Sequence, residues 1–235
     1  MSHNHQRFHE HLRTLGAPAR SRMLDHPFWT GLCDGSLPGA ALVQFVLQDT
    51  SYLLPGYARA LSRCASEVAD DRHALLLMRC ALATLESRDR LDEAFAASAP
   101  GMGLSLPSRR PPIAAATDAY CRLFAQSSAR SVVAGLGSAL PMIWFQLDLA
   151  DSLLAQVRDG SRYLSWVRSY HPGPQYRYAV NAFLEMIDDL AQRGSAEERE
   201  VLTACFLTAS QHEWRLADSA LLAPGANGTS NARSV

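Results

Sequence analysis

The sequence of 235 residues lacks the charge pattern of a nucleic-acid-binding protein. Its 22 Lys and Arg are balanced by 23 Asp and Glu, the formal net charge is -1, and the arginines are scattered along the chain. Binding to DNA or RNA needs a basic patch or stripe that neutralises phosphates. We therefore expect the partners to be small molecules or further copies of the chain.

The sequence also lacks clustered cysteines and any long uninterrupted apolar run. Its 5 cysteines are far apart and form no C-x-x-C pair or Cys/His cluster, which argues against a zinc site and against a disulfide framework. The first residues are polar and no apolar run reaches 18 residues, so we expect neither a signal peptide nor a membrane span. These absences predict a cytoplasmic protein with reduced thiols and no bound metal.

What the sequence does contain is helical periodicity. Leu and Ala are abundant, β-branched residues are sparse, and no window alternates at period two, so we predict an all-α fold. We expect one helical domain over residues 1–222 and a disordered tail over 223–235. A first helix is expected over about 6–15, a short one starts at Pro27, and a long helix that follows Pro38 contains Pro55 as a kink. Further helices are expected over about 70–97, 113–127, 130–157, 161–170, 175–193 and 196–222, with a surface loop at 99–112.

Two carboxylates interrupt the apolar stripes of their helices. Glu213 lies on a stripe that runs from Leu202 to Ala220, and Asp49 lies on a stripe that also carries Tyr52. Burial of an acid costs free energy unless a partner or a ligand satisfies it. Either acid alone could cap a neighbouring backbone or pair with an arginine, but the two together favour a shared polar cavity.

Other unusual residues have simpler explanations. Pro141 lies inside the apolar helix at 130–157 and removes one backbone N–H, which either eases packing or opens room for a ligand. His26 precedes a proline, and we expect its ring to bond nearby main chain. Four more histidines near the start of the chain are expected to be solvated: His3, His5, His9 and His11.

The motifs, taken in order, resemble the TenA, or thiaminase II, family, whose fold is the haem-oxygenase-like helical bundle. They run from about residue 20 to 222 at close to the family's spacings. The matching residues are His26-Pro27-Phe28, Asp34-Gly35-Ser36-Leu37-Pro38, Gln48-Asp49 with Tyr52, Tyr120, Leu140-Pro141 with Trp144, Tyr163, Trp166, Tyr170, Ile187-Asp188 and His212-Glu213-Trp214.

The resemblance implies a role in thiamin salvage. Members hydrolyse the C–N bond on the methylene of an aminopyrimidine and release hydroxymethylpyrimidine. By the same resemblance, Asp49 binds the pyrimidine and Glu213 handles protons. The pocket is expected to be lined by Tyr52, Tyr120, Met142 and Tyr170.

The sequence departs from the family at the nucleophile. Standard members have a cysteine directly after the Leu-Pro of the central helix, where this chain has Met142, and a thioether cannot act as a thiolate does. Leu216 replaces an aromatic residue that commonly covers the pyrimidine. The chain resembles a branch without that cysteine, in which carboxylates do the chemistry and some members act on formylated aminopyrimidines.

Three functions therefore compete. The first is a cysteine-independent hydrolase of an aminopyrimidine or formyl-aminopyrimidine compound, with Glu213 as base, without a cofactor, and assembled as a homotetramer. The second is a protein that binds a heteroaromatic ligand without turnover, for which a soft side chain at Met142 is also suited. The third, haem or di-iron chemistry, is disfavoured because Glu86 is followed by Arg90 where a metal site needs a histidine.

Overall fold

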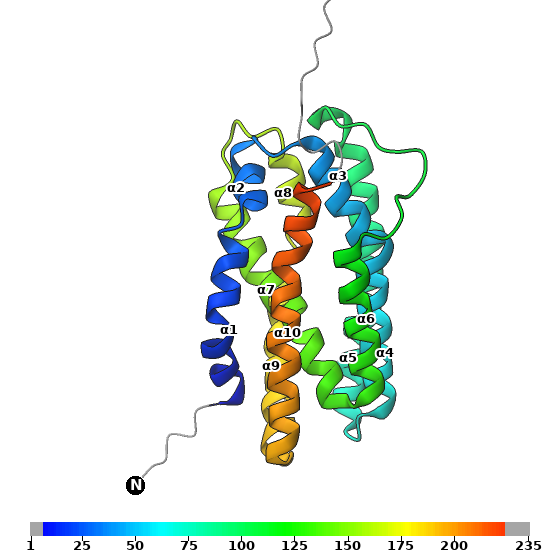
Figure 1. The fold of residues 1–235 in the computed structure, drawn as a ribbon, viewed down its shortest axis with the longest axis vertical. Helices are drawn as coiled ribbons and strands as arrows, with labels where there is room; N and C mark the ends of the chain where they lie inside the picture. The colour runs from blue at the N-terminus through cyan, green and yellow to red at the C-terminus, as the bar shows by residue number, and fades with distance from the viewer. Residues whose placement is uncertain (1–6, 224–235) are drawn as a thin grey trace, which may run out of the picture.

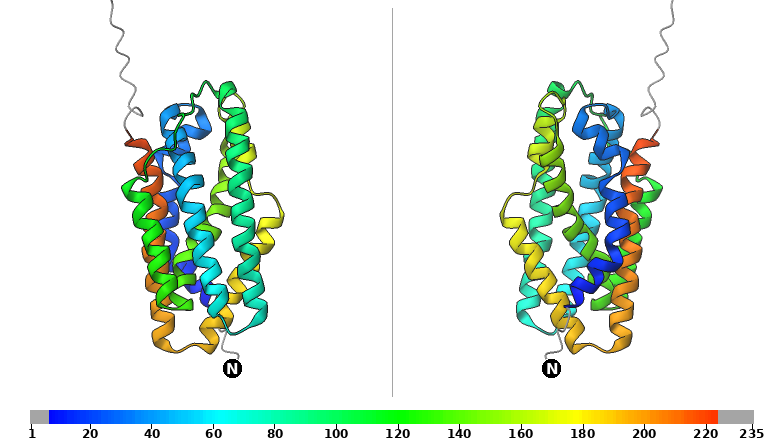
Figure 2. Two further views of the ribbon diagram at one scale, coloured as in Figure 1. Left: turned by 90° about the vertical axis from the view of Figure 1, so that its right-hand side faces the viewer. Right: turned by 90° about the vertical axis from the view of Figure 1, so that its left-hand side faces the viewer.

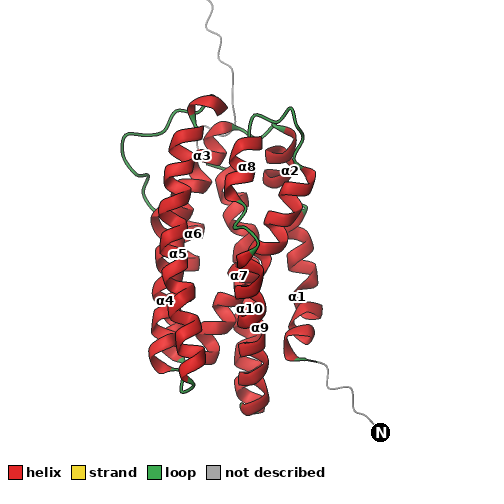
Figure 3. Ribbon diagram, turned by 180° about the vertical axis from the view of Figure 1, so that it is seen from behind, coloured by secondary structure: helices red, strands yellow, loops and turns green. Residues whose placement is uncertain are grey.

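The computed structural model describes residues 7–223 and contains helices but no strand within that range. The helices pack into an elongated all-α bundle around one shared apolar core (Figures 1 and 3). This is the haem-oxygenase-like fold that the sequence predicts. The α-helices are α1 (Phe8–Leu24), α2 (Pro27–Asp34), α3 (Gly39–Gln48), α4 (Leu54–Glu67), α5 (Asp71–Ser98), α6 (Ala115–Arg130), α7 (Val132–Gln156), α8 (Leu164–Tyr170), α9 (Gln175–Arg193) and α10 (Ala196–Leu221).

Helix α7 is the core of the bundle. It crosses the molecule diagonally behind α10 (Figures 1 and 2). Most of its side chains are buried. Gly137 permits the close approach of α7 to α10, because a Cβ atom built there would lie 2.5 Å from the carbonyl oxygen of Leu202. By length and composition alone, α7 is long and apolar enough to cross a membrane, although Asp148 and Asp151 interrupt it. Its burial inside the bundle shows that it is a core helix.

Helix starts and stops follow from local sequence at several positions. Pro27 begins α2, and Nδ1 of His26 accepts a hydrogen bond of 3.1 Å from the backbone N–H of Phe28, as expected for its ring. Asp70 caps α5 by accepting from the N–H of Arg72. The expected loop at 99–112 contains only a short 3₁₀ turn, Pro100–Met102, and runs over the surface to Ala114.

A π-helical turn, η1 (Asp49–Leu53), separates α3 from α4. The N–H of Leu54 donates to the carbonyl of Asp49, five residues earlier, so the backbone makes one wide turn here. Pro55 follows directly and has no backbone N–H, so it cannot donate an α-helical hydrogen bond. The disruption expected at Pro55 therefore takes the form of a wide turn just before it.

Two sequence expectations near the N-terminus are wrong. Helix α1 does not stop at Gly16 but continues through Pro18 to Leu24, and Gly16 lies directly against the ring of Phe206 on α10. His9 is not solvated: its ring Nδ1 lies 2.7 Å from Oδ2 of Asp188. The predicted tail at 223–235 lies outside the described residues from 224 onward, as do His3 and His5.

Candidate active site

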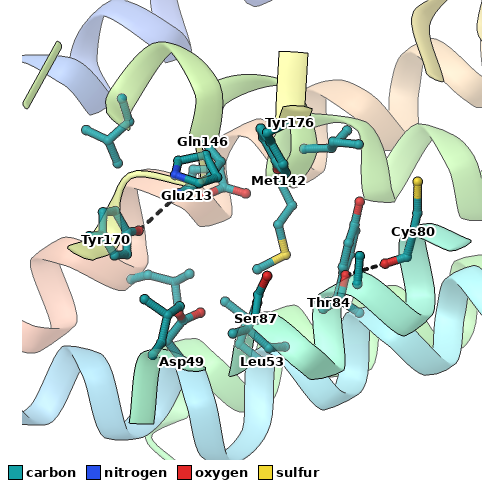
Figure 4. Close-up of a pocket in the computed structure, with 18 of the residues that line it drawn as sticks. Asp49, Leu53, Cys80, Thr84, Ser87, Met142, Gln146, Tyr170, Tyr176 and Glu213 are labelled. Carbon is teal, nitrogen blue, oxygen red and sulfur yellow. Dashed lines mark hydrogen bonds between the residues drawn. The ribbon is translucent and has the colours of Figure 1, made fainter. Parts of the chain in front are cut away.

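A cavity of about 150 Å³ opens inside the bundle among helices α4, α5, α7, α9 and α10 and the π-turn. Its walls are mainly apolar, with a few polar groups that converge on one space (Figure 4). Small-molecule sites commonly have this combination of apolar walls and few polar groups. The cavity is therefore the candidate site.

Both acids that the sequence singles out line this cavity. Asp49 reaches it from the π-turn and Glu213 from α10. Burial, followed by the charge of Glu213 and that of Asp92, raises the pKa of Asp49 to about 7. Burial likewise raises the pKa of Glu213 to about 7. Two carboxyl groups with such pKa values are poised to exchange protons near neutral pH.

Tyr120 of α6 holds Glu213 in place. Its hydroxyl donates a hydrogen bond of 2.6 Å to Oε1 of Glu213, and this bond favours the charged carboxylate. The ring of Tyr120 is fully buried and stacks on His212, with centroids 5.0 Å apart. Tyr120 itself does not line the cavity. Tyr120 was expected to line the pocket; instead it lies outside the cavity and positions Glu213 through this hydrogen bond.

Two further predicted residues, Met142 and Tyr170, do line the cavity. The side chain of Met142 extends from α7 into the space between the polar groups (Figure 4). The hydroxyl of Tyr170 donates a hydrogen bond of 3.1 Å to Oε1 of Gln146, which follows Met142 by one helical turn. Sequence reasoning missed Gln146, although a polar residue four positions after Met142 on an apolar helix is a usable signal.

Tyr52 does not line the cavity, so that expectation is wrong. Its hydroxyl donates to the carbonyl of Pro111 in the surface loop, at 2.7 Å. The cause is the π-turn, which rotates the residue three positions after Asp49 away from the face that an α-helix would give it. The residues that line the cavity from this segment are instead Leu53, Leu54 and Tyr57.

Tyr57 of α4 and Tyr176 of α9 were not predicted from the sequence. Both line the cavity, and burial is the main cause that raises the pKa of each hydroxyl above its usual range. Cys80 of α5 also lines it, and burial raises the pKa of this thiol to about 11, so it stays protonated at neutral pH. These three residues come from different helices and meet only because of how the helices pack, which the periodicity of each helix does not show.

Comparison with known proteins gives one family match and several curated relatives. Residues 15–221 match the TENA/THI-4/PQQC family. The aminopyrimidine aminohydrolase of Bacillus subtilis is 27% identical over 214 residues, which are 89% of this chain and 87% of that protein. The thiamine biosynthesis multifunctional protein ThiED of Corynebacterium glutamicum is 29% identical over 195 residues, 82% of this chain. The chain spans only 24% of the length of ThiED.

Solved structures share the fold. A TenA homologue from P. horikoshii OT3 superposes with a TM-score of 0.74 at 22% identity and covers 92% of this chain and 98% of its own. A TenA family protein, described as a transcription regulator, from Silicibacter sp. TM1040 gives a TM-score of 0.76 at 21% identity, with 95% and 100% covered. At these low sequence identities, the similarity shows that the fold is shared and nothing further.

Proposed function

Since the chain belongs to the TENA/THI-4/PQQC family, we propose that it hydrolyses a C–N bond of an aminopyrimidine or formyl-aminopyrimidine compound in thiamin salvage. The chain's similarity to the aminopyrimidine aminohydrolase of Bacillus subtilis along most of both proteins supports a hydrolase of this kind. The observation that carries the proposal is the convergence of Asp49 and Glu213 on one buried cavity.

Asp49 is the anchor in this proposal. A carboxyl group in an apolar wall accepts hydrogen bonds from the exocyclic amine of an aminopyrimidine and shares a proton with a ring nitrogen. The raised pKa of Asp49, about 7, matches the group to such proton sharing near neutral pH. Tyr170 and Gln146, joined by their hydrogen bond, form a polar wall of the same cavity.

Glu213 is the base. As a carboxylate it takes a proton from water while the water oxygen bonds to the carbon attached to the departing nitrogen. The C–N bond then breaks, and Glu213 returns the proton to that nitrogen, so the carboxylate is regenerated. The pKa of Glu213, about 7, suits both transfers near neutral pH, and the hydrogen bond from Tyr120 fixes the direction of the carboxylate.

No cysteine is needed in this scheme. By the resemblance to the TenA family, Met142 occupies the position at which standard members carry their nucleophilic cysteine. Cys80 shares the cavity, but its raised pKa leaves little thiolate at neutral pH. The proposal therefore assigns the chemistry to carboxylates. We expect release of hydroxymethylpyrimidine from thiamin itself to be very slow or absent.

The test is turnover of an aminomethylpyrimidine and of its N-formyl derivative, followed by mass spectrometry of the products. Glu213→Gln is expected to lower kcat by about 10²-fold or more while binding stays within a few-fold, because Gln keeps the shape but takes no proton. Asp49→Asn is expected to weaken binding instead. Glu185→Gln, on the exposed face of α9, is the matched control and should change neither. Undiminished turnover by Glu213→Gln would refute the assignment.

A second candidate is a protein that binds a heteroaromatic ligand without turnover. The mainly apolar walls and the flexible Met142 side chain favour it. In that case wild-type protein binds the aminopyrimidines with no product formed, and Glu213→Gln changes affinity only modestly. The product measurement above separates the two candidates.

We also propose that the protein works in the cytoplasm as a homo-oligomer, with a tetramer as the expected size. An apolar stripe on the outer face of α5 supports self-association. It consists of four exposed side chains at helical spacing: Leu75, Met78, Leu82 and Leu85. Stripes of this kind on a soluble bundle commonly mark an interface.

A further inference from the structure

The carboxyl groups of Asp49 and Glu213 are held in different ways. Glu213 accepts a hydrogen bond from Tyr120, which fixes the direction of its carboxyl group. Within residues 7–223, no group donates a hydrogen bond to the carboxyl group of Asp49, although that group lines the cavity. The direction in which it points therefore depends on the backbone that carries it.

That backbone is the π-turn, whose first residue is Asp49. A π-turn inside an α-helical segment is rare and is frequently found at a functional site. The ordinary α-helical turn is its alternative and would direct the side chains differently. Contacts made by residues in and beside the π-turn therefore help to decide where the carboxyl group points.

Gln48 directly precedes the π-turn and connects it to the loop before α6. Nε2 of its side chain donates to the carbonyl of Pro112 at 2.9 Å, and Oε1 accepts from the backbone N–H of Ala114 at 2.7 Å. The residue is 5% exposed, so both bonds are shielded from water. Because the amide uses its donor and its acceptor on one segment, it fixes that segment against the end of α3.

Tyr52 makes the second connection, from within the π-turn. Its hydroxyl donates to the carbonyl of Pro111 at 2.7 Å, one residue before the carbonyl that Gln48 binds. Proline has a fixed φ, so Pro111 and Pro112 present these two carbonyls from a stiff segment. The thiol of Cys121 on α6 also donates to the backbone carbonyl of Tyr52, at 3.5 Å. The turn is therefore anchored on both sides of its acidic residue.

We propose that Gln48 and Tyr52 are positioning residues, which direct the carboxyl group of Asp49 into the cavity by fastening the π-turn to loop residues 111–114. Neither lines the cavity, so neither touches a ligand there. The inference rests on the proposed function, in which Asp49 binds the aminopyrimidine. A carboxyl group that already points at its ligand loses less conformational freedom on binding, so the two anchors contribute to affinity. The bond-breaking step at Glu213 does not depend on them.

The experiment is a double-mutant cycle on the affinity for an aminomethylpyrimidine, measured by ligand-detected NMR, which also reports weak binding. Tyr52→Phe removes one hydroxyl and keeps the ring, whereas Gln48→Leu removes both amide bonds. Each substitution is made in wild type and in Asp49→Ala, in which no carboxyl group remains to be directed. Tyr178→Phe, 72% exposed on α9, is the matched control. The kcat and KM for the N-formyl derivative are measured for the same variants, and thermal unfolding reports folding.

Tyr52→Phe is expected to raise Kd and KM by about two- to tenfold, as the loss of one hydrogen bond predicts, while kcat stays within about twofold. Gln48→Leu should raise Kd further, because two bonds are lost. In the Asp49→Ala background, each substitution should change Kd by less than about twofold, since the anchors then have no carboxyl group to direct. Tyr178→Phe should match wild type.

Two results would overturn this inference and leave the proposed function intact. One is a Kd of Tyr52→Phe equal to that of wild type. The other is an equal loss of affinity with and without the carboxyl group of Asp49, which would mean that the anchors serve stability alone. If Gln48→Leu does not fold, the Tyr52→Phe cycle decides by itself. Asp49→Ala protein that binds as tightly as wild type would refute both this inference and the role of Asp49 in the proposed function.

Discussion

Tyr120 and Glu213 are 93 residues apart in sequence and joined by a hydrogen bond of 2.6 Å between the phenol and Oε1 of the carboxyl group. The bond connects α6, which carries Tyr120, to α10, whose Glu213 lines the cavity. It lowers the pKa of Glu213, whereas burial, the larger effect, raises it to about 7. The protonation state of the proposed base is therefore set by two opposed and separable causes.

Removing the phenol of Tyr120 separates these two causes. Tyr120→Phe leaves burial in place and deletes the bond, so the pKa of Glu213 is expected to rise further. The acidic limb of the kcat/KM profile should then move upward by about one to two pH units, because a hydrogen bond to a charged group contributes about 1.5–3 kcal/mol net and one pH unit corresponds to about 1.4 kcal/mol. A pH-rate profile of wild type and variant checks this. A uniform loss of activity with an unmoved limb would contradict the positioning role.

Stability should fall as pH rises through the range in which the two acids titrate. Folding raises the pKa of Glu213 from 4.5 and of Asp49 from 3.8, each to about 7. At a pH between the unfolded and the folded pKa values, the unfolded chain has lost protons that the folded protein keeps. The free energy of unfolding therefore decreases as the pH rises and is lowest above about pH 7. At about 1.4 kcal/mol per pH unit, the cost is on the order of 3 kcal/mol for Glu213 and on the order of 4 kcal/mol for Asp49.

Thermal unfolding at a series of pH values from about 5 to about 8 tests this. Glu213→Gln removes one titrating group and is expected to unfold at a relatively higher temperature than wild type at the alkaline end. Glu185→Gln, exposed on α9, should follow wild type. Parallel curves for wild type and Glu213→Gln would show that the carboxyl group is not raised by folding.

The sulfur of Met142 should be dispensable. Met142→Leu keeps apolar volume in the cavity, and an exchange of this kind usually costs less than about 1.5 kcal/mol of stability. We expect turnover of the formyl-aminopyrimidine to stay within a few-fold of wild type. Loss of turnover to background in a folded Met142→Leu protein would mean that the thioether takes part in the reaction.

Gly137 should tolerate no side chain. A Cβ atom there meets the carbonyl oxygen of Leu202 at 2.5 Å and Cβ of Cys205 at 3.0 Å, so Gly137→Ala must push α7 from α10. A destabilisation of about 1–3 kcal/mol is expected, measured as a lower unfolding temperature. Gly160→Ala is the control, because nothing lies within 4 Å of its added Cβ. Equal unfolding temperatures of the two variants would contradict tight packing between α7 and α10.

A charge in the stripe on α5 should weaken the proposed oligomer. Leu82 is 58% exposed in the middle of that stripe, and Leu82→Glu places a carboxylate where a partner would otherwise bury an apolar group. Light scattering is expected to give the 25.7 kDa monomer for this variant and a larger species for wild type. Leu154→Glu, on an exposed position of α7, is the control. An unchanged mass for Leu82→Glu would exclude this face as the interface.

The sequence indicated the site where a charged residue lay on the apolar face of its predicted helix. Asp49 and Glu213 interrupt apolar stripes, and the structure brings both to one cavity. Helix boundaries from α7 to α10 agree with the predicted ones within about three residues, since caps and breakers are local signals. Gly16 and Pro18 have the pattern of a helix stop, yet α1 runs through both to Leu24, and the contact of Gly16 with Phe206 on α10 is not visible in the local sequence.

The remaining site residues depend on contacts that no local pattern records. Tyr176 enters the cavity because α9 returns to it after the turn that follows Tyr170. Tyr52 was expected on the face of Asp49 by α-helical periodicity, which holds only if every turn has the same width. The π-turn at Asp49–Leu53 is wider than an α-helical turn, and Tyr57 lines the cavity where Tyr52 was expected.

That wide turn makes the recognition chemistry depend on chain length as well as on residue identity. Deleting one residue between Asp49 and Leu53 would convert the π-turn into an ordinary turn and change the angular relation between Asp49 and everything on α4. The same side chains would remain in the protein, yet the carboxyl group of Asp49 and the ring of Tyr57 would no longer line the same space. A single-codon deletion could thus alter the ligand preference of this cavity as strongly as an exchange of its lining residues.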